Sequence, residues 1–105
     1  MFSLFHHGPG LEEGLAEAEK TEDAVLLDVR TPEEYAEGHL PGSVNLPLDR
    51  IETIAIAPSR PLFVYCRSGA RSAQACSILK RRGYDARKIG GVLGYRGRLE
   101  RGTEE

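Results

Sequence analysis

Two short apolar runs, each followed by a segment of helical pattern, constrain the fold of this chain most. The runs are Ala24–Val29 (AVLLDV) and Pro61–Tyr65 (PLFVY), and each is typical of a buried β-strand. Helical patterns follow at Thr31–Tyr35 and at Arg71–Arg82. Strands that alternate with helices at this short spacing predict parallel βαβ units. We therefore expect an α/β fold in which helices cover both faces of the sheet.

The rest of the chain supplies further strands and helices. A short strand is expected around Val44, after a Pro-Gly turn signal, and another over Asp85–Ile89. The other expected segments are an edge strand at residues 2–5 (FSLF), helices at residues 11–20 and 49–56, a turn and glycine-weakened helix at residues 90–100, and a loose tail at residues 101–105. No internal repeat or low-complexity linker divides the chain, so residues 1–105 are expected to form a single domain.

Composition argues against several classes of protein. The 105 residues are 40% apolar and 29% charged, the balance of an ordinary soluble globular protein. Fourteen basic and 16 acidic residues give a net charge of −2, so no general nucleic-acid surface is expected. No segment approaches the roughly 18 apolar residues of a membrane-spanning helix. The N-terminus has neither the basic start nor the apolar core of a signal peptide. We therefore expect a monomeric cytosolic protein that does not bind membranes.

The cysteine and histidine pattern predicts neither a disulfide framework nor a metal site. Cys66 and Cys76 are the only cysteines, and they do not form a Cys-x-x-Cys pair. A zinc site would have to combine them with the scattered residues His6, His7 and His39. Both thiols are expected to be reduced in the cytosol.

The stretch after the second apolar run has the composition of an anion-binding loop. Cys66 lies at the carboxyl end of the expected strand, where ligands bind in sheets of this type. The loop that follows consists of Arg67, Ser68, Gly69, Ala70 and Arg71. Gly69 can adopt backbone conformations closed to most residues, so the N–H groups of the turn can converge on an anion. The helix N-terminus and the two arginines add positive potential. All three effects favour a Cys66 thiolate and an anionic substrate.

Cys76 has different surroundings. It lies on the apolar face of the expected helix, beside Ala75 and Leu79. A packing role, typical of a cysteine in a core, is therefore expected for Cys76, with a role as a resolving cysteine as the alternative.

At these residues the chain resembles the rhodanese family of single-domain sulfurtransferases. The match covers about residues 24–95 and rests on three blocks in order: LLDVRTPEEYAEGHLPGSVNLP, FVYCRSGARSAQA and GYDARKIGGVLGY. The resemblance implies a parallel five-stranded sheet flanked by helices. It also implies that Cys66 takes a sulfane sulfur from a donor such as thiosulfate and passes it to cyanide or a protein thiol, with no metal or organic cofactor. The loop N–H groups would stabilise the thiolate and the persulfide alike, and the arginines would orient a dianionic donor.

The resemblance also gives Asp28 a supporting role near the mouth of the site. Asp28 is expected either to contact an arginine of the loop such as Arg67, or to act as a capping or turn carboxylate. Thr31 and Glu34 have the spacing of a capping box. Arg30 and Glu34, four residues apart, are expected to form a structural ion pair.

Three further residues have expected roles outside the chemistry. A structural hydrogen bond is expected for His39, although a histidine can also act as an acid or base near neutral pH. Asn45 is expected to fix a turn. Tyr95 stands where the family often has a tryptophan, so acceptor choice at the mouth of the pocket is not inferred from the family.

The residues leave three functions open: a sulfurtransferase, a phosphatase or arsenate reductase, and a non-catalytic binding module. A persulfide carrier, loaded by one protein and unloaded by another, is a variant of the first function. The binding module is disfavoured because it would not need Cys66 in a full loop. The phosphatases that resemble this fold have a loop one residue longer before their arginine. Here Arg71 comes one residue earlier and Ser72 stands in that place, which favours sulfur over phosphorus chemistry.

Overall fold

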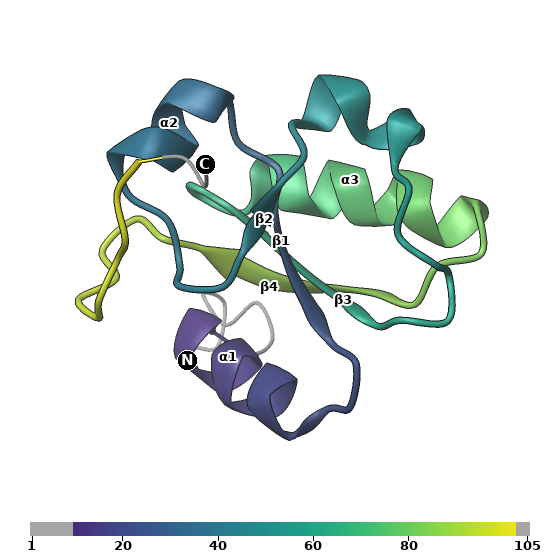
Figure 1. Cartoon of the computed structure of the whole chain (residues 1–105), viewed down its shortest axis with the longest axis horizontal. Helices are drawn as coiled ribbons and strands as arrows, with labels where there is room; N and C mark the ends of the chain where they lie inside the picture. Colours follow the sequence, from purple (N-terminus) through teal and green to yellow (C-terminus); the bar gives the residue numbers. More distant parts are fainter. Residues whose placement is uncertain (1–9, 103–105) are drawn as a thin grey trace, which may run out of the picture.

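A computed structural model of the chain describes residues 10–102 (Figure 1). Its elements, in chain order, are α1 (Leu11–Lys20), β1 (Val25–Asp28), α2 (Pro32–Glu37), β2 (Val44–Asn45), the 3₁₀ helix η2 (Leu48–Thr53), β3 (Leu62–Cys66), α3 (Ala70–Arg81) and β4 (Ala86–Gly91). The strands form one parallel sheet in the order β2-β1-β3-β4. The alternation of strands and helices thus produces the predicted α/β fold.

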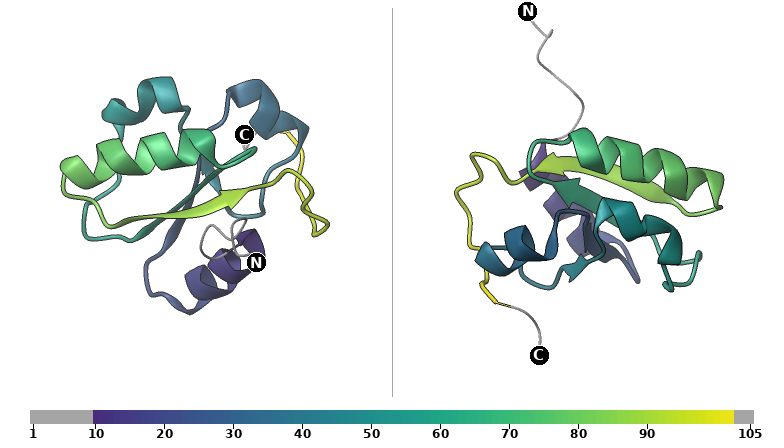
Figure 2. Two further views of the ribbon diagram at one scale, coloured as in Figure 1. Left: turned by 180° about the vertical axis from the view of Figure 1, so that it is seen from behind. Right: turned by 90° about the horizontal axis from the view of Figure 1, so that it is seen from above.

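The described part of the sheet has four strands rather than the five that the resemblance implied. The predicted edge strand at residues 2–5 lies outside the described residues. Figure 2 shows α1 on one face of the sheet and α3 with η2 on the other, so helices cover both faces as predicted.

The alternation of side chains along β3 divides the core into two layers. Leu62, Val64 and Cys66 belong to the cluster that packs against α3 and η2. Phe63 and Tyr65 belong to the cluster on the α1 side. All five side chains are fully buried, as expected for a central strand of a parallel sheet. This alternation places the Cys66 side chain on the α3 face, at the carboxyl edge of the sheet.

Two predicted helices differ from the structure. Residues 49–56 form only the short 3₁₀ helix η2, because the backbone at Ile54 turns to an extended conformation and lets Ile54 and Ile56 pack on the core. No helix forms at residues 92–102, the described part of the chain after β4. Glycines weaken a helix there, and the chain instead crosses to α2, where His39 and Glu100 form an antiparallel bridge. Among the described residues, no helix is long and apolar enough to cross a membrane.

Candidate active site

Backbone N–H groups point at the sulfur atom of Cys66 from two sides. The Gly69 N–H donates to Cys66 Sγ at 3.0 Å, and the Ser72 N–H donates at 3.3 Å. Cys66 itself is fully buried at the end of β3. Converging N–H groups at a helix N-terminus stabilise negative charge, so the loop provides a setting for an anion at this end of β3.

Gly69 gives the loop its shape. Its φ of 105° and ψ of −16° lie in the left-handed region that side chains disfavour. The turn at Gly69 reverses the chain directly after Cys66, so α3 begins at Ala70, one residue earlier than expected. The predicted convergence of N–H groups on the cysteine is therefore present in the structure.

Ser72 is a site residue that the sequence reasoning did not assign. It is fully buried, and besides its N–H contact its hydroxyl lies 3.6 Å from Cys66 Sγ. The hydroxyl donates to the Gly69 carbonyl at 3.0 Å and so braces the turn. The sequence signal for this role is the position of Ser72 on the first turn of the helix, six residues after the cysteine, where its N–H can point back at the sulfur.

The carboxyl end of β4 supports the loop from the opposite side. Val92 N–H donates to the Cys66 carbonyl at 3.0 Å, and Leu93 N–H donates to the Arg67 carbonyl at 2.9 Å. A Cβ atom at Gly91 would collide with the Arg67 backbone. Gly91 therefore permits a close approach of two backbones that the sequence alone did not reveal.

Asp28 forms a buried ion pair with Arg30, not with an arginine of the loop. Arg30 Nη2 lies 2.7 Å from Asp28 Oδ2, and Arg30 Nη2 also donates to the Gly38 carbonyl. Asp28 Oδ1 accepts the Arg30 backbone N–H at 2.9 Å, which is the contact of a turn carboxylate. Of the two roles predicted for Asp28, the structure shows the turn carboxylate.

The predicted ion pair between Arg30 and Glu34 is wrong. Glu34 instead accepts two hydrogen bonds from Arg71, at 2.7 and 3.0 Å, so α2 is tied to the first turn of α3. The pairing with Arg71 lowers the pKa of Glu34 to about 2, and the Thr31 backbone contributes. The capping box of Thr31 and Glu34 is confirmed.

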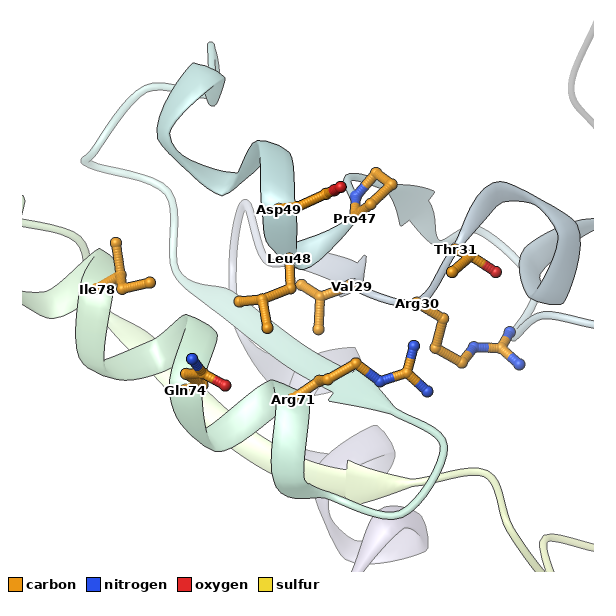
Figure 3. Close-up of a pocket in the computed structure, with 9 residues that line it drawn as sticks. All are labelled: Val29, Arg30, Thr31, Pro47, Leu48, Asp49, Arg71, Gln74 and Ile78. Atoms are coloured by element: carbon orange, nitrogen blue, oxygen red, sulfur yellow. The ribbon is translucent and has the colours of Figure 1, made fainter.

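Arg67 is exposed, and its side chain makes no hydrogen bond or ion pair with any residue in the described range 10–102. Two pockets lie beside the loop. A pocket of about 290 Å³ is lined by Arg67, Glu34, Glu37 and the chain after β4. A pocket of about 460 Å³ lies between α3 and η2 (Figure 3), and its lining includes Val29, Leu48, Arg71, Gln74 and Ile78. Arg30 lines both.

His39 and Asn45 have the structural roles predicted for them. His39 is buried, its Nδ1 lies 2.7 Å from the Tyr35 carbonyl, and its ring stacks on the Tyr35 ring. The Asn45 amide donates to the carbonyls of Asp28 and Arg30 and fixes the turn after β1. Tyr95 lines a pocket next to α1 rather than either pocket beside the loop.

Cys76 packs in the core on the α3 side. Burial raises the pKa of the Cys76 thiol to about 11, which disfavours a reactive thiolate there. Within residues 10–102, no group of three His, Cys, Asp or Glu side chains could hold a metal ion.

Known proteins share both the sequence pattern and the fold. The sequence model of the rhodanese-like domain family matches residues 11–96, most of the chain. The chain belongs to the rhodanese-like domain family. A sulfurtransferase of Allochromatium vinosum is 46% identical to this rhodanese-like domain over 79 residues, which is 73% of the chain and 69% of the relative.

Two other proteins extend the similarity. The thiosulfate sulfurtransferase PspE of Escherichia coli is 40% identical over 62 residues, 55% of this chain and 60% of the relative. A rhodanese-like domain protein from Staphylococcus aureus superposes with a TM-score of 0.77 at 27% identity, covering 90% of this chain and 97% of that one. The rhodanese-like domain thus belongs to a family of sulfurtransferases.

Proposed function

We propose that this protein transfers a sulfane sulfur from thiosulfate or a persulfide donor to a thiophilic acceptor, through a persulfide on Cys66. The observation that carries this proposal is the pair of N–H groups, from Gly69 and Ser72, aimed at Cys66 Sγ. Preorganised donors of this kind stabilise charge on sulfur before and after it accepts a second sulfur atom. The 40% identical thiosulfate sulfurtransferase PspE supports thiosulfate as one donor.

In the first step the Cys66 thiolate attacks the outer sulfur of thiosulfate. A new S–S bond forms, the S–S bond of thiosulfate breaks, and sulfite leaves with that electron pair. In the second step an acceptor nucleophile attacks the outer sulfur of the persulfide. Cyanide then becomes thiocyanate, or a protein thiol becomes a persulfide, and the Cys66 thiolate is restored.

The backbone around Ser72 favours sulfur over phosphate chemistry. Ser72 stands where the phosphatase pattern has its arginine, and its N–H already contacts Cys66 Sγ at 3.3 Å. The loop is one residue shorter than the phosphatase loop, so it should form a tighter cradle that suits the outer sulfur of a persulfide rather than a tetrahedral oxyanion. A shift of about 1 Å in a catalytic group can cost on the order of a hundredfold in rate, so one residue of loop decides between the reactions.

Intact-mass measurement before and after incubation with thiosulfate tests the proposal. We expect Cys66 to gain the mass of one sulfur atom and cyanide to remove it. The Cys66→Ser variant should fold normally, gain no sulfur, and show no transfer from thiosulfate to cyanide. Substantial transfer by that variant would contradict the assignment of the nucleophile.

The same preparation should not hydrolyse p-nitrophenyl phosphate. Phosphate release that depends on Cys66, without sulfur transfer, would instead support a phosphatase. Transfer to protein thiols but not to cyanide would favour the persulfide carrier, for which a cytosolic protein thiol is the proposed partner.

A further inference from the structure

Two of the guanidinium groups beside the loop are already neutralised by carboxylates. Arg30 forms a buried pair with Asp28 at 2.7 Å. Arg71 is the last residue of the loop, and both of its terminal nitrogens donate to Glu34. This two-point contact occupies the part of the Arg71 side chain that would otherwise hold an oxyanion. Arg71 therefore offers a donor little net positive charge.

The third guanidinium group faces a pocket that contains a further carboxylate. Arg67 has no ion-pair partner in the described part of the chain, but it lines the same 290 Å³ pocket as Glu37. The side chains around the loop thus carry about as much negative as positive charge. The side-chain charge that remains for an anion is that of Arg67, beside the N–H groups of the loop, and this one positive charge suits a single negative charge.

We propose that Glu34 makes the site selective for a monoanionic organic sulfane-sulfur donor, such as a persulfide or a thiosulfonate, over the thiosulfate dianion. The inference rests on the proposed function and names the donor class for the same site. Glu34 acts through Arg71 and is a positioning residue. It pairs with the Arg71 guanidinium and so neutralises the positive charge that would otherwise bind a dianion.

The neighbouring pocket offers room for the organic group of such a donor. Val29 follows β1 and lies beside Cys66, since Asp28 and Tyr65 pair in the register of β1 and β3. From Val29 the pocket extends past Leu48 and Ile78, and Arg71 projects into it (Figure 3). Apolar walls next to a neutralised arginine favour an uncharged substituent.

The chemistry with a thiosulfonate, R–SO₂–S⁻, is the same transfer with a different leaving group. The Cys66 thiolate attacks the outer sulfur, the S–S bond of the donor breaks, and a sulfinate, R–SO₂⁻, leaves with the electron pair. A persulfide donor, R–S–S⁻, releases a thiolate in the same way. No oxidant or reductant is consumed in either reaction.

Methanethiosulfonate and thiosulfate form a matched pair of donors, because a methyl group replaces one oxygen and removes one negative charge. We would measure kcat/KM for both donors, with cyanide as acceptor, in the wild type and in Glu34→Gln. Glutamine at this position keeps the capping box with Thr31, so the main change is release of the Arg71 charge. The control is Glu33→Gln, which changes net charge equally on an exposed neighbour.

We expect Glu34→Gln to raise kcat/KM for thiosulfate about tenfold. This is the effect of one charge-assisted hydrogen bond, which the released Arg71 would donate to thiosulfate. The gain for methanethiosulfonate should be about threefold, since a monoanion feels the released charge half as strongly as a dianion. The ratio of the two donors should therefore shift by about threefold in Glu34→Gln and stay unchanged in Glu33→Gln. The double variant Glu34→Gln/Arg71→Gln should restore the wild-type ratio, because it removes both charges.

An active Glu34→Gln enzyme with the wild-type donor ratio would overturn this inference and leave the proposed function standing. A double variant that uses thiosulfate relatively less well than the wild type would also overturn it, because Arg71 would then bind the dianion directly. Sulfur transfer from neither donor in any of the proteins would overturn the proposed function itself.

Discussion

Cys66 and Cys76 are both buried on the α3 face of the sheet, but their sulfur atoms have different neighbours. Cys66 Sγ accepts two backbone N–H groups. Cys76 packs among apolar side chains, and burial raises the pKa of its thiol to about 11. A persulfide anion needs the first environment and is destabilised by the second. The difference supports the proposed chemistry at Cys66 and a packing role for Cys76.

Replacement of Cys76 by alanine should therefore affect stability rather than activity. Loss of the buried sulfur leaves a small cavity, and we expect the free energy of unfolding to fall by about 1 kcal/mol. The rate of thiosulfate:cyanide transfer should stay within about twofold of the wild type, because a small change of packing in the core leaves the loop around Cys66 in place. Urea unfolding measures the free energy of unfolding, and steady-state kinetics on the same preparation measure the transfer rate. A collapse of turnover in a stable Cys76→Ala protein would point to a two-cysteine mechanism.

At the scale of elements, the loop takes its geometry from three ends that meet at one edge of the sheet. β3 ends at Cys66, α3 begins at Ala70 and β4 ends at Gly91. The chain after β4 donates two hydrogen bonds to the carbonyls of Cys66 and Arg67. Gly91 makes this approach possible, because any side chain there would meet the Arg67 backbone.

The Gly91→Ala variant tests how strictly that contact positions the loop. The added methyl group must push the loop away from β4, so we expect about 2 kcal/mol of lost stability. A displaced loop should lower sulfur transfer by about a hundredfold. Gly10→Ala is a suitable control, since a Cβ atom there meets nothing within 4 Å. Wild-type activity in Gly91→Ala would show that the loop tolerates displacement.

Caps and turns that depend on neighbouring residues were predictable from the sequence, whereas contacts between distant segments were not. The capping box of Thr31 and Glu34 spans three residues and was predicted correctly. The partner of the Glu34 carboxylate was not, because Arg71 lies 37 residues away and reaches Glu34 only after α2 and α3 are assembled. Likewise, Gly69 was identified from its loop, whereas the role of Gly91 depends on the pairing of β3 with β4.

At the scale of the whole molecule, the pair between Glu34 and Arg71 connects α2 to α3 across the carboxyl edge of the sheet. The side chains of Arg71 and Glu34 are 34% and 27% exposed, so solvent screens part of their attraction. We take the contribution of such a pair to stability as about 1 kcal/mol. The same ion pair thus serves donor selectivity at the site and the docking of two helices.

Acid should remove this contribution over a defined pH range. The pKa of Glu34 falls from 4.5 to about 2 in the folded protein, mainly through its hydrogen bonds with Arg71. A carboxyl group whose pKa is lowered by folding stabilises the protein fully above its unfolded value and loses that effect as pH falls through the folded value. The stability advantage of the wild type over Glu34→Gln should thus be about 1 kcal/mol at pH 7.

That advantage should shrink between pH 4.5 and 2 and vanish below, because Glu34 is then protonated in both states. Urea unfolding of both proteins across this range, with Glu33→Gln as the control, measures the difference directly. Glu33 forms no ion pair within residues 10–102, so its variant should follow the wild type at every pH. A constant difference between wild type and Glu34→Gln down to pH 2 would mean that the difference does not come from the charge of Glu34, and that its ion pair with Arg71 contributes nothing to stability.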